Sequence, residues 1–170
     1  MNANKVKNAV LRYFRFDKQC SHVATEVWDC DVIASDEKAL FEVEVKISWG
    51  DYKREFDKQK HRMADAAGLI NLPGDHEPNY RYFAAPSDLA HRIKEDLKTH
   101  HQHYGIIAVR EWVGHFYTKE RGEYEKETTG VTVIKRAKKI HGEPPSGKAL
   151  MQIVKRISSE LITMREAVRN

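Results

Sequence analysis

Apolar and charged side chains alternate along residues 41–47, FEVEVKI. Successive side chains of a β-strand point to opposite faces, so one face of this strand would pack on a core. The other face would carry Glu42, Glu44 and Lys46 in a row. Upstream, Asp31 begins another short apolar run, and a polar turn separates the two runs. A hairpin of this kind can bring two carboxylates and a lysine together.

Two carboxylates beside a lysine suit the hydrolysis of phosphodiesters. Asp31 and Glu44 would hold a hard divalent cation, Mg²⁺ or Mn²⁺, which keeps several waters and completes its shell with phosphate oxygens of the substrate. The metal polarises the phosphoryl group and lowers the pKa of a bound water. Lys46, two residues from Glu44 on the same face, would orient that water or stabilise the developing negative charge.

This set of residues resembles the site of the PD-(D/E)XK nucleases. The resemblance implies that Asp31 is the aspartate of the motif, that Glu44 is its second acid and that Lys46 is its lysine. It also implies that the peptide carbonyl of Val45 is a further metal contact. The activity implied is metal-dependent hydrolysis of DNA, by an enzyme similar to restriction endonucleases or Holliday-junction resolvases.

The resemblance extends downstream of the charged strand. EVEVKISWGDYKREFDKQKH is similar to a segment of phage and bacterial members, in which the strand leads into Ser-x-x-Asp-(Phe/Tyr) and a basic helix that ends in Lys-His. The matching positions are Ser48, Asp51, Tyr52, Lys60 and His61. Cys30 replaces the proline of the motif. The similarity covers roughly residues 20 to 110, the size of one compact core.

Three further side chains are auxiliary candidates. Glu42 precedes Glu44 on the same face but lacks the Glu-x-Lys spacing, and Glu26 lies five residues before Asp31. His61 would lie about two turns into the basic helix, where it could touch a phosphate. A structural alternative is that the alternating charges form the solvated face of an antiparallel strand, where cross-strand pairs contribute about 0.2 to 1 kcal/mol.

Positive residues form two clusters that would neutralise phosphates and give salt-dependent binding to DNA. Their members are Lys53, Arg54, Lys58 and Lys60 after the charged strand, and Lys135, Arg136, Lys138 and Lys139 near the C-terminus. The alternative is that these clusters are solvated surface. The net charge of +4 is mild, so the positions of the charges carry more information than their sum.

Composition predicts one soluble core in the cytoplasm. The chain has 170 residues, of which 41% are hydrophobic, and this is enough for a single domain. Its two cysteines do not form a disulfide framework, so a reducing compartment is expected. No apolar run approaches the roughly 18 residues of a membrane span, and the N-terminus lacks the apolar core of a signal peptide.

The pattern of apolar residues predicts a mixed α/β sheet. It indicates a helix over 6–16, strands over 23–28, 31–34 and 40–47, a basic helix from Ser48 to about Gly68, a loop over 69–79, a strand over 80–85, a helix from Ser87 to His103, and a strand over 106–109. The last two strands would form a parallel crossover pair beside the antiparallel meander of the first three. Helices would flank this sheet, as the resemblance to restriction endonucleases also implies.

The C-terminal third is expected to extend the domain. Residues 112–117 and 131–134 could be added edge strands around a charged loop at 119–129. A break at Pro144-Pro145-Ser146-Gly147 divides the nuclease-like domain, 1–141, from an amphipathic helix within 142–170. That helix has apolar residues near heptad spacing, so it would pack on the domain or on a partner, a homodimer among them.

Two other classes of function compete with the nuclease hypothesis. One is a catalytically silent module that binds nucleic acid or takes part in an assembly on the same fold. The other is a protein-interaction module that uses the C-terminal helix.

Overall fold

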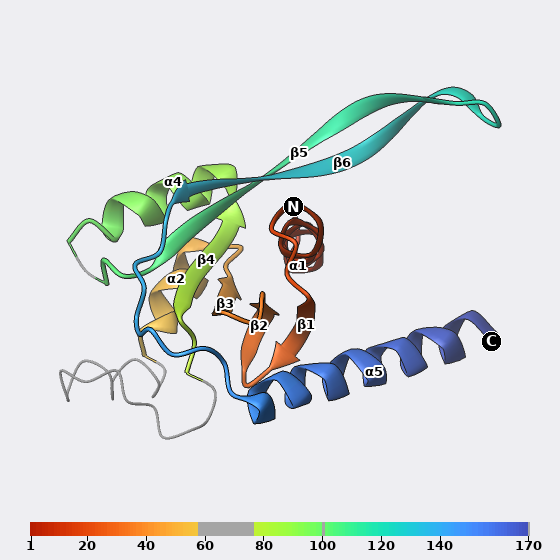
Figure 1. Ribbon diagram of the computed structural model, residues 1–170. Helices are drawn as coiled ribbons and strands as arrows, with labels where there is room; N and C mark the ends of the chain where they lie inside the picture. Colours follow the sequence, from red (N-terminus) through yellow and green to blue (C-terminus); the bar gives the residue numbers. More distant parts are fainter. Residues whose placement is uncertain (58–76, 100, 170) are drawn as a thin grey trace.

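A computed structural model describes residues 1–57, 77–99 and 101–169 (Figure 1). A six-stranded mixed sheet with strand order β1-β2-β3-β4-β5-β6 forms its centre. The strands are β1 (His22–Val27), β2 (Cys30–Ser35), β3 (Leu40–Val45), β4 (Tyr80–Pro86), β5 (Gly105–Thr118) and β6 (Gly122–Lys135). The helices are α1 (Ala3–Arg12) with a π-helical extension η1 (Tyr13–Asp17), α2 (Trp49–Glu55), α4 (Ser87–Asp96) and α5 (Gly147–Arg169).

The pairing confirms the predicted α/β topology. Strands β1, β2 and β3 form an antiparallel meander, and β4 and β5 are parallel. Strand β3 is also parallel to β4, so the parallel part has three strands, and β6 returns antiparallel to β5. Helix α2 ends at Glu55 with Phe56 as its C-cap, so the prediction of one continuous basic helix from Ser48 to about Gly68 is wrong. Residues 58–68 and most of the predicted loop at 69–79 lie outside the described residues.

Helices cover both faces of the sheet. One face packs on α1 and η1 through a core that includes Val6, Val10, Phe14, Val43, Val45 and Ile107. On the opposite face, α2 and α4 cover the strands β4 and β5 with Tyr52, Ile93, Phe83 and Ile106. Near β1 and β2, α5 buries Ile153 against Ile33 and Leu40. The alternating apolar side chains of β3, Phe41, Val43 and Val45, all lie in the core with α1, whereas Leu40 on the other face packs with α5.

The helix after the charged strand begins where the sequence predicts. Ser48 has an extended backbone and its hydroxyl accepts a hydrogen bond of 3.1 Å from the amide of Asp51, which is an N-cap interaction. This cap fixes the direction in which α2 leaves β3. The seven residues of α2 then return over the sheet and bury Tyr52 and Glu55.

The prediction for the helix at 87–103 is wrong at both ends. Pro86 is its N-cap and makes no side-chain hydrogen bond, so Ser87 is the first helical residue rather than the cap. The helix ends at Asp96, and His101 has a left-handed φ of 52°, which is incompatible with a continuing helix. The ammonium of Lys135 bonds to the carbonyls of Gln102 and Tyr104, in the segment that follows the helix.

The prediction of a charged loop at 119–129 is also wrong, because β5 and β6 form one long hairpin. Their pairing continues to Thr118 opposite Gly122, and Gly122 turns the chain with a φ of +69°. The distal part of the hairpin projects beyond the sheet (Figure 1). Both faces of such a ribbon are open to water, so charged side chains suit it. One cross-strand pair on the ribbon is His115 and Glu125, with Nδ1 3.4 Å from Oε1.

Helix α5 packs on the sheet with its first half. Ile153 is fully buried, Arg156 donates a bond of 3.0 Å to the carbonyl of Thr25, and the Thr25 hydroxyl donates to Glu160 over 2.6 Å. The second half extends past β1 and exposes Leu161 and Met164 (Figure 1). Among the helices described, none is long and apolar enough to cross a membrane.

Candidate active site

The charged face of β3 is buried, which excludes the solvated-strand alternative for Glu44 and Lys46. Glu44 is 2% exposed and Lys46 is 3% exposed. A buried charge is costly unless it has a partner of opposite charge. The arrangement of partners around these two side chains therefore decides what the site can do.

Lys46 lies between two buried carboxylates. Its Nζ is 2.6 Å from Oε2 of Glu55 and 3.6 Å from Oε2 of Glu44. With all three groups ionised, this triad carries one net negative charge in a place that excludes bulk water.

Glu55 of α2 is a site residue that the sequence did not predict. Tyr52, Glu55 and Phe56 lie three and four positions apart, so they share one face of α2. Tyr52 and Phe56 are aromatic and pack on Phe83 of the sheet. A glutamate on the apolar face of an amphipathic helix was the signal in the sequence that could have identified this residue.

Asp31 contacts β3 at the peptide between Glu44 and Lys46. The register pairs Val32 with Val43, and one step further the Asp31 carboxylate accepts a hydrogen bond of 2.8 Å from the amide of Val45. Val45 is the residue whose carbonyl the nuclease resemblance makes a metal contact. Asp31 thus bonds to the peptide next to Glu44, but its carboxylate also has a partner that the sequence did not indicate, from a helix on the face of the sheet opposite α2 and Glu55.

That partner is Lys7 of α1. Its Nζ lies 2.7 Å from Oδ1 of Asp31 and also bonds to Glu26. Burial lowers the pKa of Lys7, but the hydrogen bonds that its ammonium donates to Asp31 and Glu26 outweigh burial, so the net pKa is raised. Glu26 has a left-handed φ of 53°, and this bend directs its carboxylate to Lys7. Glu26 and Asp31 therefore both bond to the Lys7 ammonium.

Glu42 faces a buried arginine on the next strand. The register places Glu42 opposite Arg81, and Oε2 of Glu42 is 3.5 Å from Nε of Arg81. Arg81 is 2% exposed, and its Nε and Nη2 have no hydrogen-bond partner in the described part of the chain. Glu42 thus balances the charge of Arg81, which restricts its availability as an auxiliary acid.

The donor set is chemically suited to Mg²⁺ or Mn²⁺. Both metals prefer oxygen ligands, and a Mg²⁺ site commonly uses one or two carboxylates together with water and substrate phosphate. Asp31 and Glu44 are such ligands, although Asp31 would have to exchange Lys7 for the metal. In residues 1–57, 77–99 and 101–169, no group of three or more His, Cys, Asp or Glu side chains is arranged to hold a metal.

The predicted DNA-binding lysines have different environments. Lys53 bonds to both carboxylate oxygens of Asp96, at 2.8 and 3.0 Å, and lies over the ring of Trp49. Lys135 is tied to two backbone carbonyls, and burial together with Lys138 lowers its pKa. Arg54, Arg136, Lys138 and Lys139 are exposed, as is Lys53, and the structure does not describe Lys58, Lys60 or His61.

Comparison with known proteins supports the fold. No family model matches the sequence, and none of the curated proteins is significantly similar to it. A solved structure entitled "SPO1766 protein of unknown function from Silicibacter pomeroyi" is similar over 100% of this chain and 92% of that chain. Its TM-score is 0.56 and its sequence identity is 11%. At this identity the similarity shows the α/β fold alone.

Proposed function

We propose that this protein hydrolyses phosphodiester bonds of DNA in a reaction that depends on Mg²⁺ or Mn²⁺. The observation that carries the proposal is the arrangement around the Val45 peptide. Asp31 bonds to that peptide, and the buried side chains of Glu44 and Lys46 flank it in the sequence. The order acid, acid, lysine along β2 and β3 is that of the PD-(D/E)XK motif, which this sequence resembles.

Each residue has a separate part in this proposal. Glu44 and Asp31 would hold the metal with carboxylate oxygens, and the Val45 carbonyl would add a third oxygen. When bound, the metal supplies polarisation of the phosphoryl group and activation of water. Lys46 would place a fixed positive charge beside the reacting phosphate, and Glu55 would hold that ammonium in position from α2.

The proposal is tested with supercoiled plasmid, linear duplex and branched DNA, incubated with Mg²⁺, Mn²⁺ or a chelator. We expect nicking or cutting only with metal, because the carboxylates alone cannot activate water at neutral pH. Glu44→Gln, purified in parallel, should lose both metal binding by calorimetry and cleavage. Wild-type protein that cleaves none of these substrates, or a Glu44→Gln preparation that cleaves equally well, would contradict the proposal.

A nucleic-acid-binding module without turnover is the second candidate. It is favoured by the ion pairs of the site, since Lys7 neutralises Asp31 and Lys46 neutralises one charge of the Glu44–Glu55 pair. A protein that binds DNA in chelator, with an affinity that falls steeply with salt, but never cleaves it, would favour this candidate.

The proposed location is the cytoplasm. Cys20 and Cys30 are both buried thiols outside any disulfide. Burial raises the pKa of Cys20 to about 11, so this thiol stays protonated and unreactive near neutral pH. These properties are compatible with a reducing compartment.

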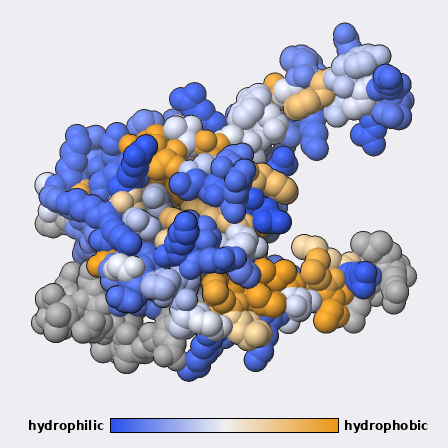
Figure 2. All heavy atoms as spheres, viewed as in Figure 1, coloured by the Kyte–Doolittle hydropathy of each residue, from blue (hydrophilic) through white to orange (hydrophobic). Residues whose placement is uncertain are grey.

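We further propose that the distal half of α5 pairs with a second copy of the chain. Leu161 and Met164 are exposed and continue the near-heptad stripe, and Figure 2 shows hydrophobic surface along this helix. Leu161→Glu should convert a dimer into a monomer in light scattering, while Thr163→Glu, on another face, should leave the dimer intact. A wild-type monomer at high concentration would contradict the pairing.

A further inference from the structure

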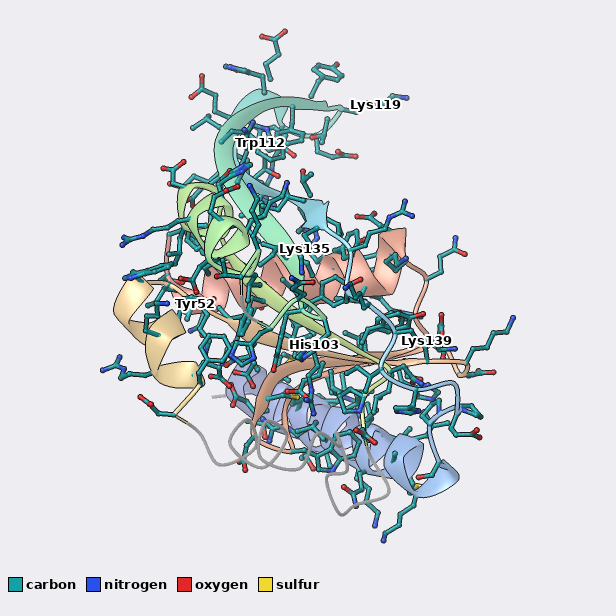
Figure 3. All side chains as sticks on the ribbon, turned by 90° about the vertical axis from the view of Figure 1, so that its left-hand side faces the viewer. Tyr52, His103, Trp112, Lys119, Lys135 and Lys139 are labelled. Carbon is teal, nitrogen blue, oxygen red and sulfur yellow. The ribbon has the colours of Figure 1, made fainter. Side chains whose placement is uncertain are left out.

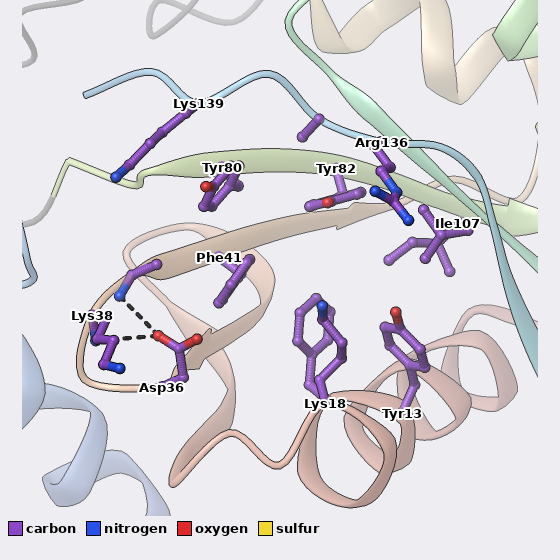
Figure 4. A pocket seen from close by; sticks show the side chains of 14 residues that line it. Tyr13, Lys18, Asp36, Lys38, Phe41, Tyr80, Tyr82, Ile107, Arg136 and Lys139 are labelled. Carbon is purple, nitrogen blue, oxygen red and sulfur yellow. Dashed lines mark hydrogen bonds between the residues drawn. The ribbon is translucent and has the colours of Figure 1, made fainter. Parts of the chain in front are cut away.

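A cavity of about 720 Å³ lies on the face of the sheet opposite Glu44 and Lys46 (Figure 4). Phe41 lines it, and since side chains alternate along β3, Glu42 and Glu44 point away from it. Tyr13 and Lys18 reach it from the end of α1 and η1, and Arg136 and Lys139 reach it from the segment after β6 (Figure 4). Pockets of this size bind small molecules.

Aromatic side chains form one wall of the cavity. The rings of Phe41 and Tyr80 are stacked, with centroids 5.2 Å apart and an interplanar angle of 12°. Tyr82 lies beside them on β4, and its ring is so close to Gly105 that any Cβ there would lie 2.2 Å from it. The half-buried Tyr82 is thereby fixed in orientation. A rigid aromatic wall favours a planar ring as ligand.

The cavity is also positively charged. Four cations line it, Lys18, Lys38, Arg136 and Lys139, against the single carboxylate of Asp36. Asp36 already accepts hydrogen bonds from the amides of Lys38 and Ala39, at 3.1 and 2.9 Å. In the part of the chain that the structure describes, the four cationic groups make no recorded hydrogen bond or ion pair.

Four lysines elsewhere in the molecule have carboxylate partners. The ammonium groups of Lys5, Lys7, Lys46 and Lys53 each bond to carboxylates. Like charges gathered around one hollow repel one another, and an anion would relieve this repulsion. An arginine and three lysines are also the side chains that proteins use for phosphate.

We propose that this cavity binds a nucleoside phosphate, with the base against Tyr80 and Tyr82 and the phosphate on Arg136 and the lysines. The ligand is either a free nucleotide or one unpaired nucleotide of a single strand, because a base inside a duplex is already stacked and cannot enter. The site lies across the sheet from the proposed nuclease centre and does not depend on it.

The test measures binding in chelator, so that cleavage plays no part. Mononucleotides are titrated by calorimetry, and a labelled single strand and its duplex by fluorescence anisotropy. We expect the single strand to bind more tightly than the duplex, and inorganic phosphate to bind more weakly than any mononucleotide. Tight binding of mononucleotides identifies a free nucleotide as sufficient, whereas binding of the strand alone identifies a nucleotide within a chain.

Arg136→Gln/Lys139→Gln is the main variant, because both side chains are exposed and the fold should tolerate it. Its affinity for the nucleotide ligand should fall at least 10-fold, and the salt slope for the single strand should become shallower by about 1.4. Lys119→Gln/Arg121→Gln is the matched control with the same loss of charge, since Lys119 lies at the far end of the hairpin and Lys139 beside the sheet (Figure 3).

Tyr80→Leu adds a second measurement and should weaken binding by roughly 10-fold through the loss of stacking. Thermal melting of each variant verifies that it is folded. Equal affinity in wild type and the Arg136→Gln/Lys139→Gln variant would overturn the proposal. So would an equal loss in the hairpin control, or duplex binding as tight as that of the single strand.

Discussion

Lys46→Ala is expected to reduce DNA cleavage in Mg²⁺ by at least about 100-fold, which corresponds to roughly 3 kcal/mol of transition-state stabilisation. The reason is the loss of a positive charge beside the proposed site of reaction. Asp31 and Glu44 remain, so calorimetry should still detect metal binding. Rates are measured on supercoiled plasmid in Mg²⁺ and in Mn²⁺.

The buried position of Lys46 makes a measurement of stability necessary in this experiment. Removal of Lys46 leaves Glu44 and Glu55 buried without the ammonium between them, so the variant should also be less stable. Rates therefore need correction for the folded fraction, determined by circular dichroism at the assay temperature. If folded Lys46→Ala cleaves as fast as wild type, the mechanism assigned to this lysine is wrong.

Glu55→Ala is expected to lower the free energy of unfolding by about 3 to 5 kcal/mol, because it removes the closer partner of a buried ammonium. Lys46 is 3% exposed and would retain only Glu44, at 3.6 Å. Urea denaturation followed by circular dichroism measures the change. Cleavage should fall as well, since Lys46 would lose the contact that positions it.

Two variants make this result specific to the buried pair. Glu95→Ala removes an exposed glutamate that bonds to Lys98 on the surface, and its stability should remain close to that of wild type. Glu44→Gln/Lys46→Met/Glu55→Leu removes all three charges and should recover much of the lost stability while remaining inactive. An unfolding free energy of Glu55→Ala no lower than that of Glu95→Ala would show that the pair does not stabilise the fold.

Local patterns were sufficient to predict the elements of the central sheet. The alternation along β3 predicted a strand with two unlike faces, and the spacing between β4 and β5 predicted their parallel pairing. The serine at the start of α2 predicted its cap. Each of these features depends on residues close together in the chain, where steric preferences and hydrogen bonds to the nearby backbone act directly.

Longer-range contacts decided the rest of the fold. Residues 119–129 of the β5 and β6 hairpin were predicted as a loop because their charged side chains suit water, and only pairing between the strands makes them part of a ribbon. Helix α4 ends at Asp96, and Lys135, far along the chain, bonds to the carbonyls of Gln102 and Tyr104 in the segment that follows. Local propensity contains no information on such partners.

The candidate site also has features that the sequence predicted and features that depend on tertiary packing. Sequence alone determined that Asp31, Glu44 and Lys46 lie on neighbouring strands, because strand period and turn length set their positions. Only the tertiary structure decided that Lys7 reaches Asp31 from α1, that Glu55 reaches Lys46 from α2, and that the charged face is covered. Burial and ion pairing depend on which elements pack together, and packing joins residues that the sequence keeps apart.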